Sequence, residues 1–194
     1  GSQVYLADDI RLRRQVAVRV LRRTYADDPL FLEEFRSEAQ KATTLNHPNL
    51  VPIYDWGEQE LPYVVTEYLS GGNLRNLVDT AGKISSSQAL LIGIEITKGL
   101  EYAHKRGVTH LSLKPTNILF DFESNIRIAG FGISKTLASF SSTNAETPRG
   151  QRYLSPEQIN GRRIDQRSDI YSLSCLLFES VARNQSPNQP YDVD

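Results

Sequence analysis

The fold of this chain is decided by the stretch His110-Leu111-Ser112-Leu113-Lys114-Pro115-Thr116-Asn117, which the triplet Gly130-Phe131-Gly132 follows at a short distance. Between these two motifs, apolar runs at 117–120 and 126–129 flank the polar segment 121–125. Apolar runs on either side of a turn-forming segment are typical of a β-hairpin. The sequence therefore predicts that a small hairpin joins the two motifs.

The regions around these motifs are predicted to be mainly helical. Apolar positions recur with helical spacing over 87–106, and Gly107 follows where a C-terminal cap belongs. A strongly apolar helix is expected over 169–181. The stretch 134–151 has almost no apolar pattern and predicts a mobile loop, while the Asn-, Gln- and Pro-rich tail 185–194 predicts disorder.

The first third of the chain is predicted to be rich in strands. Runs at 4–7 and 16–21 favour a hairpin, and the runs at 50–56 and 63–69 favour two further strands. The intervening segment 29–46 begins with a proline and carries its apolar residues on one helical face, which predicts a helix. The order of these elements indicates an α+β fold.

Length, charge and cysteine content exclude several classes of protein. The chain has 194 residues, of which 39% are hydrophobic and 23% charged, and its net charge of -1 excludes a basic nucleic-acid binder. No apolar run approaches the roughly 20 residues of a membrane-spanning helix, and no signal peptide is present, so no membrane contact is expected in this segment. The single cysteine, Cys175, excludes a disulfide framework and a zinc site built on cysteines.

Taken together, these stretches resemble a protein kinase domain, most closely those of the bacterial Ser/Thr kinases. The resemblance implies a two-lobed fold, in which 1–69 form a small antiparallel β lobe with one helix and the hinge, and 70–184 form part of a mainly α-helical lobe. Because the sequence has no methionine and begins Gly1-Ser2, and because both ends of the family pattern are missing, a segment truncated at both ends is expected. The resemblance is carried by 16–19, 35–39, 47–51, 66–69, 110–117, 130–132, 153–157 and 168–172.

Three catalytic positions of the family carry other residues here. A kinase uses a lysine on its third strand to hold phosphates, an aspartate to accept the hydroxyl proton and a second aspartate to hold magnesium. Those positions are Arg19, Ser112 and Gly130 in this sequence. Glycine offers no ligand atom, and the loss of general-base action alone costs roughly 10²–10⁴ in rate. The resemblance therefore implies a pseudokinase without catalytic residues.

The family positions Glu38, Lys114 and Asn117 are retained. We expect Arg19 to pair with Glu38 as a structural clasp between strand and helix. Lys114 and Asn117 are expected to serve the hydrogen bonds of their own loop. Leu111 stands where the family carries an arginine that meets a phosphorylated activation loop, which puts activation by that route in doubt.

Other polar side chains are expected to be structural. The resemblance places His110 beneath Phe131 as a core histidine, and it implies that Asp169 ties the loop through backbone hydrogen bonds. His47 and His104 are isolated in the sequence, so no ligand role is expected for them.

Three functions from different classes remain open. The first is a catalytically inactive regulatory or scaffolding module, which needs neither cofactor nor metal. The second is a metal-independent nucleotide sensor that binds ATP without Mg²⁺. The third is a weak residual Ser/Thr phosphotransferase that uses Lys114 and Asn117, with Asn117 as its side-chain metal ligand. The adenine pocket implied by the resemblance consists of Val4, Ala17, Thr66, Glu67, Leu69 and Leu119.

The expected partners are proteins. Thr143 and Thr147 lie in the segment where family members are modified, so both are candidate phosphorylation sites for an upstream kinase. A phosphothreonine there would recruit a phosphopeptide reader. Bacterial members of the family often sit on the cytoplasmic side of a membrane-anchored protein, so a cytoplasmic location is expected. No nucleic-acid partner is expected.

Overall fold

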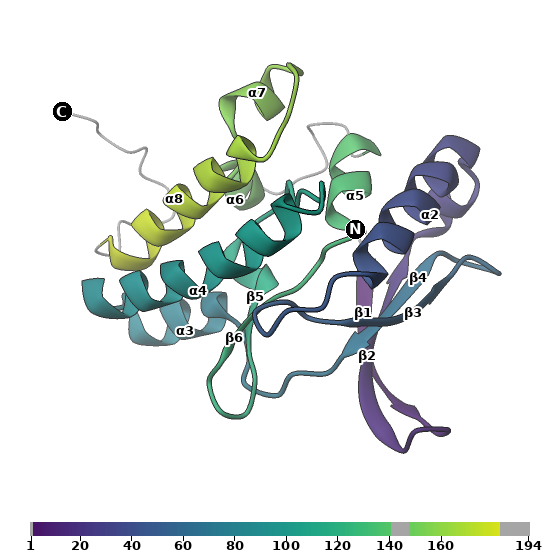
Figure 1. Ribbon diagram of the computed structural model, residues 1–194, viewed down its shortest axis with the longest axis horizontal. Coiled ribbons are helices and arrows are strands. Elements are labelled where there is room, and N and C mark those ends of the chain that lie inside the picture. Colours follow the sequence, from purple (N-terminus) through teal and green to yellow (C-terminus); the bar gives the residue numbers. More distant parts are fainter. Residues whose placement is uncertain (1, 141–147, 183–194) are drawn as a thin grey trace.

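The computed structural model describes residues 2–140 and 148–182, arranged as a strand-rich small lobe beside a helical larger lobe (Figure 1). The small lobe contains an antiparallel four-stranded sheet with the strand order β1-β2-β4-β3. Its elements are β1 (Ser2–Asp9), β2 (Arg14–Leu21), α1 (Arg23–Ala26), α2 (Pro29–Thr43), β3 (Ile53–Gly57) and β4 (Tyr63–Glu67). The elements that follow are α3 (Leu74–Ala81), α4 (Ser86–His104), a 3₁₀ turn (Pro115–Asn117), β5 (Ile118–Phe120), β6 (Ile126–Ile128), α5 (Ser134–Phe140), α6 (Pro148–Gln151), α7 (Pro156–Ile159) and α8 (Arg167–Val181).

Helix α2 forms because its sequence supplies both a cap and an apolar face. The Asp28 carboxylate accepts hydrogen bonds from two amides of the first turn, which would otherwise lack a partner. Phe31 and Phe35 are fully buried, and the Phe35 ring meets Trp56 edge to face with a centroid separation of 5.8 Å. This packing fastens α2 to the sheet and places Glu38 on the buried side of the helix.

Helices α4 and α8 pack against each other in the larger lobe (Figure 1). Ser85 begins α4 with a capping box, in which its hydroxyl accepts from the Gln88 amide and the Gln88 side chain accepts from the Ser85 amide. Gly93 allows α8 to approach closely, because a Cβ at this position would lie 2.9 Å from the Leu177 side chain. The core of the lobe therefore gathers around the fully buried Ile96 of α4.

The hairpin β5–β6 joins the two lobes. On one side, Ile128 forms a parallel bridge with Leu50, in the connection between α2 and β3. On the other side, the Phe120 amide donates to the Gly72 carbonyl, at a distance of 3.0 Å, just after the hinge. The loops at both ends of the hairpin are thereby held at the junction of the lobes.

The predicted α+β fold and its division into two lobes are confirmed. The predicted helix over 29–46 corresponds to α2, and the predicted helices over 87–106 and 169–181 correspond to α4 and α8. The hairpin expected after Asn117 is β5–β6, whose strands pair from Ile118 opposite Ile128.

The prediction of a loop over 134–151 is wrong where the structure describes this stretch. Its first part forms α5, and 148–151 form α6. Leu137 and Phe140 lie on one side of α5 and pack against the core beneath α2. Most of the surrounding sequence is polar, so two apolar residues are too few to produce a helical pattern in the sequence. The tail 185–194 and the candidate phosphorylation sites Thr143 and Thr147 lie outside the described residues.

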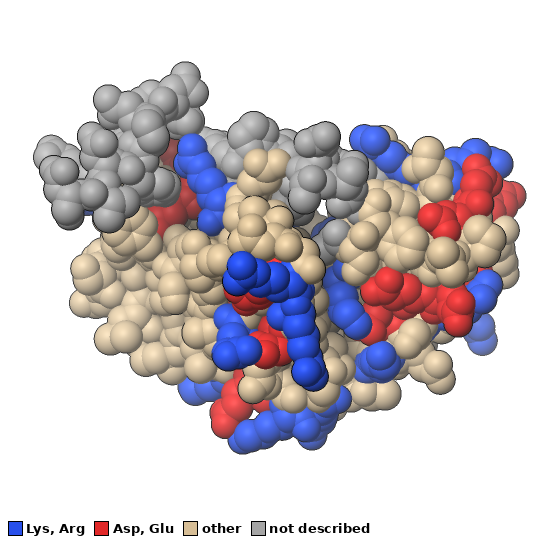
Figure 2. Space-filling model, turned by 90° about the horizontal axis from the view of Figure 1, so that it is seen from above, with Lys and Arg blue, Asp and Glu red and all other residues tan. Residues whose placement is uncertain are grey.

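Charges of both signs lie side by side on the molecular surface. Figure 2 shows basic and acidic side chains intermixed on the face it presents. Elsewhere in the described residues, individual charges pair directly, such as Arg36 with Glu58 at 2.7 Å. None of the helices within 2–140 and 148–182 combines the length and apolar character that a membrane span requires.

Candidate functional site

The candidate site lies where the loop 110–117 and the triplet 130–132 meet at the ends of the hairpin. His110 is completely buried in this loop, and its ring meets Phe131 edge to face at 4.8 Å. Its Nε2 lies 3.0 Å from the Ala129 carbonyl oxygen, and its Nδ1 accepts from the Ser112 amide at 3.2 Å. These partners require a neutral ring with its proton on Nε2. Burial lowers the pKa of His110, so the predicted role as a core histidine is confirmed.

Asp169 of α8 holds the backbone of the same loop. Its carboxylate is fully buried and accepts from the amides of His110 (2.9 Å) and Leu111 (2.7 Å). It also lies 2.8 Å from Nε2 of His104, at the end of α4. The predicted structural role of Asp169 is confirmed. His104, which the sequence shows as isolated, is its third partner.

Ser112 stands at the family's proton-accepting position, and two residues of the same loop, Leu111 and Asn117, have structural roles. Leu111 has a φ of +58°, a left-handed conformation, and its side chain is buried. Its carbonyl accepts from the Gln158 side chain at 2.8 Å. Asn117 is buried and donates through Nδ2 to the Ser112 carbonyl at 2.9 Å. The prediction that Asn117 serves the hydrogen bonds of its own loop is therefore confirmed.

Gly130 occupies a backbone conformation that favours glycine. Its φ is +105°, outside the regions that L-residues normally adopt. A Cβ there would lie 2.7 Å from Oγ of Ser134 and 3.4 Å from Nε2 of His110. The Gly130 carbonyl also accepts from the Ser134 amide at 3.0 Å, at the start of α5. The position that the family fills with a metal-binding aspartate is thus built into a tight turn.

The expected clasp between Arg19 and Glu38 is wrong. The Glu38 carboxylate accepts instead from Lys135 of α5 at 2.8 Å and from Lys41 at 3.0 Å. Burial opposes the ionisation of Glu38, but the hydrogen bonds from both lysines outweigh it and lower its pKa. Lys135 follows Gly132 by three residues, and the chain brings it back onto α2. The sequence contains no signal that distinguishes this lysine from a solvated one.

Arg19 is left without a carboxylate partner among the described residues. Its guanidinium is partly buried, and burial lowers its pKa. In addition to burial, the positive charges of Lys114 and Arg19 lower the pKa of His110. Both cations therefore act on the buried ring at the junction of the lobes.

A double-mutant cycle distinguishes the two possible partners of Glu38. Glu38→Gln and Lys135→Gln are expected to couple by about 1 kcal/mol, because the pair joins a buried carboxylate to a half-exposed ammonium. Glu38→Gln and Arg19→Gln are expected to be additive within about 0.5 kcal/mol. Urea unfolding of the single and double variants measures both values. A larger coupling for Arg19 would contradict the assignment of Lys135.

The same pair predicts a pH dependence of stability. The folded state lowers the pKa of Glu38, so folding favours the ionised carboxyl. The stabilisation is complete above the ordinary pKa of 4.5 and is lost as the pH falls through the lowered pKa. The difference in unfolding free energy between the wild type and Glu38→Gln should therefore shrink below pH 4.5, and a difference that grows there would contradict the pair.

The six residues of the expected adenine pocket lie along the sheet, the hinge and the hairpin. Ala17 pairs with Thr66 across β2 and β4, and Val4 lies opposite Arg19 on β1. Val4 is more than half exposed. Leu119 of β5 bridges to the segment that follows the hinge. The complete set is Val4, Ala17, Thr66, Glu67, Leu69 and Leu119.

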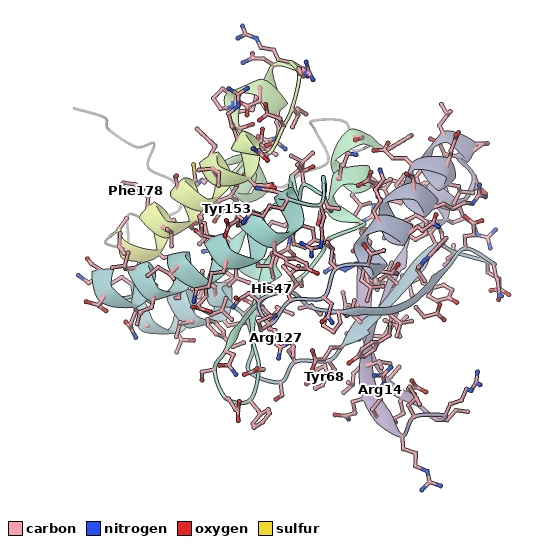
Figure 3. The ribbon with its side chains drawn as sticks, viewed as in Figure 1. Arg14, His47, Tyr68, Arg127, Tyr153 and Phe178 are labelled. Carbon is pink, nitrogen blue, oxygen red and sulfur yellow. The ribbon has the colours of Figure 1, made fainter. Side chains whose placement is uncertain are left out.

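Arg127 connects the lobes beside the hinge, and sequence reasoning missed it. From β6 its guanidinium lies 3.6 Å from Glu67 of β4 and 3.5 Å from Asp121. Figure 3 shows Arg127 near Tyr68, the hinge residue that follows Glu67. Because Glu67 and Arg127 lie far apart in the sequence, no local pattern could reveal the contact between them.

A second group that sequence reasoning missed joins α3 to α8. Arg75 donates to the hydroxyl of Tyr153 at 2.7 Å and to Glu179 at 3.0 Å, and the Tyr153 hydroxyl donates to Glu179. Burial and the Glu179 carboxylate raise the pKa of Tyr153. Figure 3 places Tyr153 beneath α8. The group fixes the segment before α7 against the larger lobe.

The donor set at the site does not suit a divalent cation. Mg²⁺ prefers oxygen ligands and is usually bound through one or two carboxylates. The loop and the triplet contribute Ser112, Asn117 and Gly130, none of which carries a carboxylate. Within the described residues, no group of three or more His, Cys, Asp or Glu side chains could hold a metal ion.

Comparisons with known proteins place the chain among kinases. The family model described as "Protein kinase domain" matches residues 1–191. The chain is 44% identical over 185 residues to the serine/threonine-protein kinase PknB of Mycobacterium leprae, covering 92% of this chain and 30% of the relative. It is 42% identical over 180 residues to PrkC of Bacillus subtilis, covering 92% and 28%.

A solved structure is similar over nearly the whole chain. The kinase domain of Mycobacterium tuberculosis PknI, in a form with one cysteine replaced by alanine, superposes with a TM-score of 0.78 at 25% identity, covering 98% of this chain and 73% of that chain. By contrast, the chain spans less than a third of the length of the curated relatives named above.

Proposed function

The chain belongs to the protein kinase domain family, among the bacterial Ser/Thr kinases, and on this premise we propose that it is a catalytically inactive member that acts as a regulatory or scaffolding module. The observation that carries the proposal is the geometry of Gly130. The family's metal-binding carboxylate is missing there, and the φ of +105° and the neighbouring Ser134 hydroxyl leave no suitable place for one.

The remaining residues offer no substitute for the lost groups. Phosphoryl transfer depends on positioning, on neutralisation of phosphate charge by metal ions and on a group that orients or deprotonates the nucleophile. Ser112 stands at the proton-accepting position, and a neutral hydroxyl accepts a proton poorly at pH 7. Asn117 already donates to the Ser112 carbonyl. Such a module would act through a protein partner.

Transfer of radiolabelled phosphate from ATP tests the proposed inactivity. We expect no incorporation into the chain or into a generic protein substrate, with either Mg²⁺ or Mn²⁺, under conditions in which the catalytic domain of PrkC is active. Incorporation that Asn117→Ala abolishes would contradict the proposal and would support a residual phosphotransferase that uses Lys114 and Asn117.

Metal-independent nucleotide binding is a second candidate function, and the state of Arg19 favours it. Its partly buried guanidinium has no anionic partner among the described residues, because Glu38 is held by two lysines. A buried cation gains from an anion that replaces its lost hydration. With the two catalytic aspartates absent, the phosphates of ATP would meet less negative charge and would not require Mg²⁺ for neutralisation.

Thermal denaturation with ATP tests this second function. Binding stabilises the folded state by RT ln(1 + [L]/Kd), or about 2.7 kcal/mol at a concentration of 100 Kd. We expect stabilisation by ATP in the presence of EDTA, a smaller effect in Arg19→Gln and an unchanged effect in the exposed control Arg22→Gln. Stabilisation that requires Mg²⁺ would contradict both this function and the interpretation of Gly130.

A further inference from the structure

The loop between α7 and α8, residues 160–166, presents basic and apolar side chains on the outside of the larger lobe. In Figure 1, α7 stands at the top of the molecule, apart from the small lobe. Arg162 and Arg163 are exposed, and so are Ile159 at the end of α7 (57%) and Ile164 (41%). Protein interfaces are enriched in arginine, and their buried centre is more apolar than the rest of the surface. The loop therefore has the composition of an interface.

Hydrogen bonds at both ends hold the backbone of this loop in place. The Arg162 amide donates to the Glu157 carbonyl of α7 at 2.9 Å. At the other end, the Ser168 amide donates to the Asp165 carbonyl at 3.1 Å. A partner that binds here would order little additional backbone, and this lowers the entropic cost of association.

The carboxylates nearest to the two exposed arginines are already occupied. Both oxygens of Asp165 accept from the Arg167 side chain, at distances between 2.8 and 3.1 Å. Glu157 accepts from a serine hydroxyl of α8. In the part of the chain that the structure describes, neither Arg162 nor Arg163 forms an ion pair. Two adjacent positive charges thus lack a counter-charge, which the carboxylates of a partner can supply.

A cavity opens beside this loop, with a volume of about 230 Å³. Its lining comes from the start of α8 and from the end of α4 with the turn that follows, and consists of Asp165, Gln166, Arg167, His104, Gly107 and Thr109. A recess next to an exposed patch can receive one side chain of a partner, and side chains that fill such pockets carry much of the binding energy of an interface.

We propose that the α7–α8 loop and the adjoining cavity form a docking site for an acidic segment of a protein partner. Its carboxylates pair with Arg162 and Arg163, and its apolar side chains cover Ile159 and Ile164. The docking site rests on the proposed function, since a regulatory or scaffolding module acts through a partner. An acidic and partly apolar segment fits the whole surface, whereas a purely acidic one would leave both isoleucines exposed to water.

A fluorescent peptide of alternating glutamate and leucine tests the docking site on the full chain. Fluorescence anisotropy measures its dissociation constant, and we expect binding that weakens as the salt concentration rises. The double variant Arg162→Glu, Arg163→Glu should weaken binding on the order of tenfold, because two attractions become repulsions. A peptide in which glutamine replaces every glutamate should bind the wild type equally weakly. Absence of binding by the acidic peptide, or equal affinity for both peptides, would overturn the proposal.

The double variant Arg22→Glu, Arg23→Glu is the matched control. These arginines are also adjacent and exposed, but they lie in the small lobe, at the start of α1. The control changes the net charge by the same amount and should leave the affinity for the acidic peptide unchanged. Ile164→Ser should weaken binding several-fold, because an apolar contact is lost. Equal losses from the two charge reversals would show that the peptide responds only to net charge, and this would contradict a defined site.

Vesicles of phosphatidylglycerol distinguish a protein partner from a membrane surface. The wild type and the double variant Arg162→Glu, Arg163→Glu should bind these vesicles equally poorly. Vesicle binding that depends on both arginines, without binding of the acidic peptide, would assign the loop to a membrane and refute the protein partner. Because neither measurement involves ATP, a failure of the docking site would leave the proposed inactivity standing.

Discussion

Asp169→Ala is expected to lower the unfolding free energy by about 3–5 kcal/mol, because it removes an acceptor shared by two buried amides and the partly buried His104. The amides of His110 and Leu111 would each remain buried without a partner, at a cost of about 1–3 kcal/mol each. His104 would lose its contact as well. For a chain of this size, the melting temperature should fall by about 10 °C.

Thermal and urea unfolding measure the effect of Asp169→Ala. Asp165→Ala is the matched control, since Asp165 lies in the same region but is partly exposed and pairs with the exposed Arg167. The control should cost less than about 1 kcal/mol. Asp169→Asn retains the size of the side chain and one hydrogen-bond acceptor. Its loss of unfolding free energy should therefore lie between those of Asp165→Ala and Asp169→Ala. Equal losses for Asp165→Ala and Asp169→Ala would contradict the proposed anchoring of the loop.

Restoring the three family residues is expected to destabilise the chain and to leave it inactive. In the triple variant Arg19→Lys, Ser112→Asp, Gly130→Asp, the new side chain at 130 must adopt a φ near +105°. Strained backbone of this kind costs about 1–3 kcal/mol. The added Cβ also displaces the Ser134 hydroxyl, from which it would lie 2.7 Å. Phosphate transfer by the triple variant would contradict this expectation.

Two comparisons separate backbone strain from crowding at this position. Gly107 has a φ of +72° with no atom within 4 Å of an added Cβ, so Gly107→Ala measures the strain alone. Gly130→Ala should lower the unfolding free energy more than Gly107→Ala does. The double variant Gly130→Ala, Ser134→Gly should recover the part of this loss that crowding by the Ser134 hydroxyl causes. Equal losses for the two alanine variants would show that Ser134 does not constrain the site.

Several features of the site could be predicted from the sequence because they depend on local pattern. His110, Asn117 and Asp169 lie in motifs that resemble those of the kinase family, and the resemblance implies their roles. Their observed hydrogen bonds agree with those roles. The helices α4 and α8 likewise follow from their apolar content.

Other features could not be predicted because they depend on which segments meet. The sequence favoured Arg19 as the partner of Glu38, since the family pattern places a cation there. The structure brings Lys135 to that carboxylate from 97 residues further along the chain. Helix α5 was missed for the same reason, because Leu137 and Phe140 reveal an apolar face only when α2 lies opposite them.

By itself, the sequence determined the α+β fold, the order of the elements and the loss of the lysine and both aspartates at the family's catalytic positions. Hydrophobic period and residue identity are properties of the linear chain, so these conclusions needed no coordinates. The tertiary structure alone decided which cation neutralises Glu38, how tightly Gly130 is enclosed and where α5 docks. Electrostatic pairing and steric exclusion act through distances in space, and segments remote in the sequence set those distances.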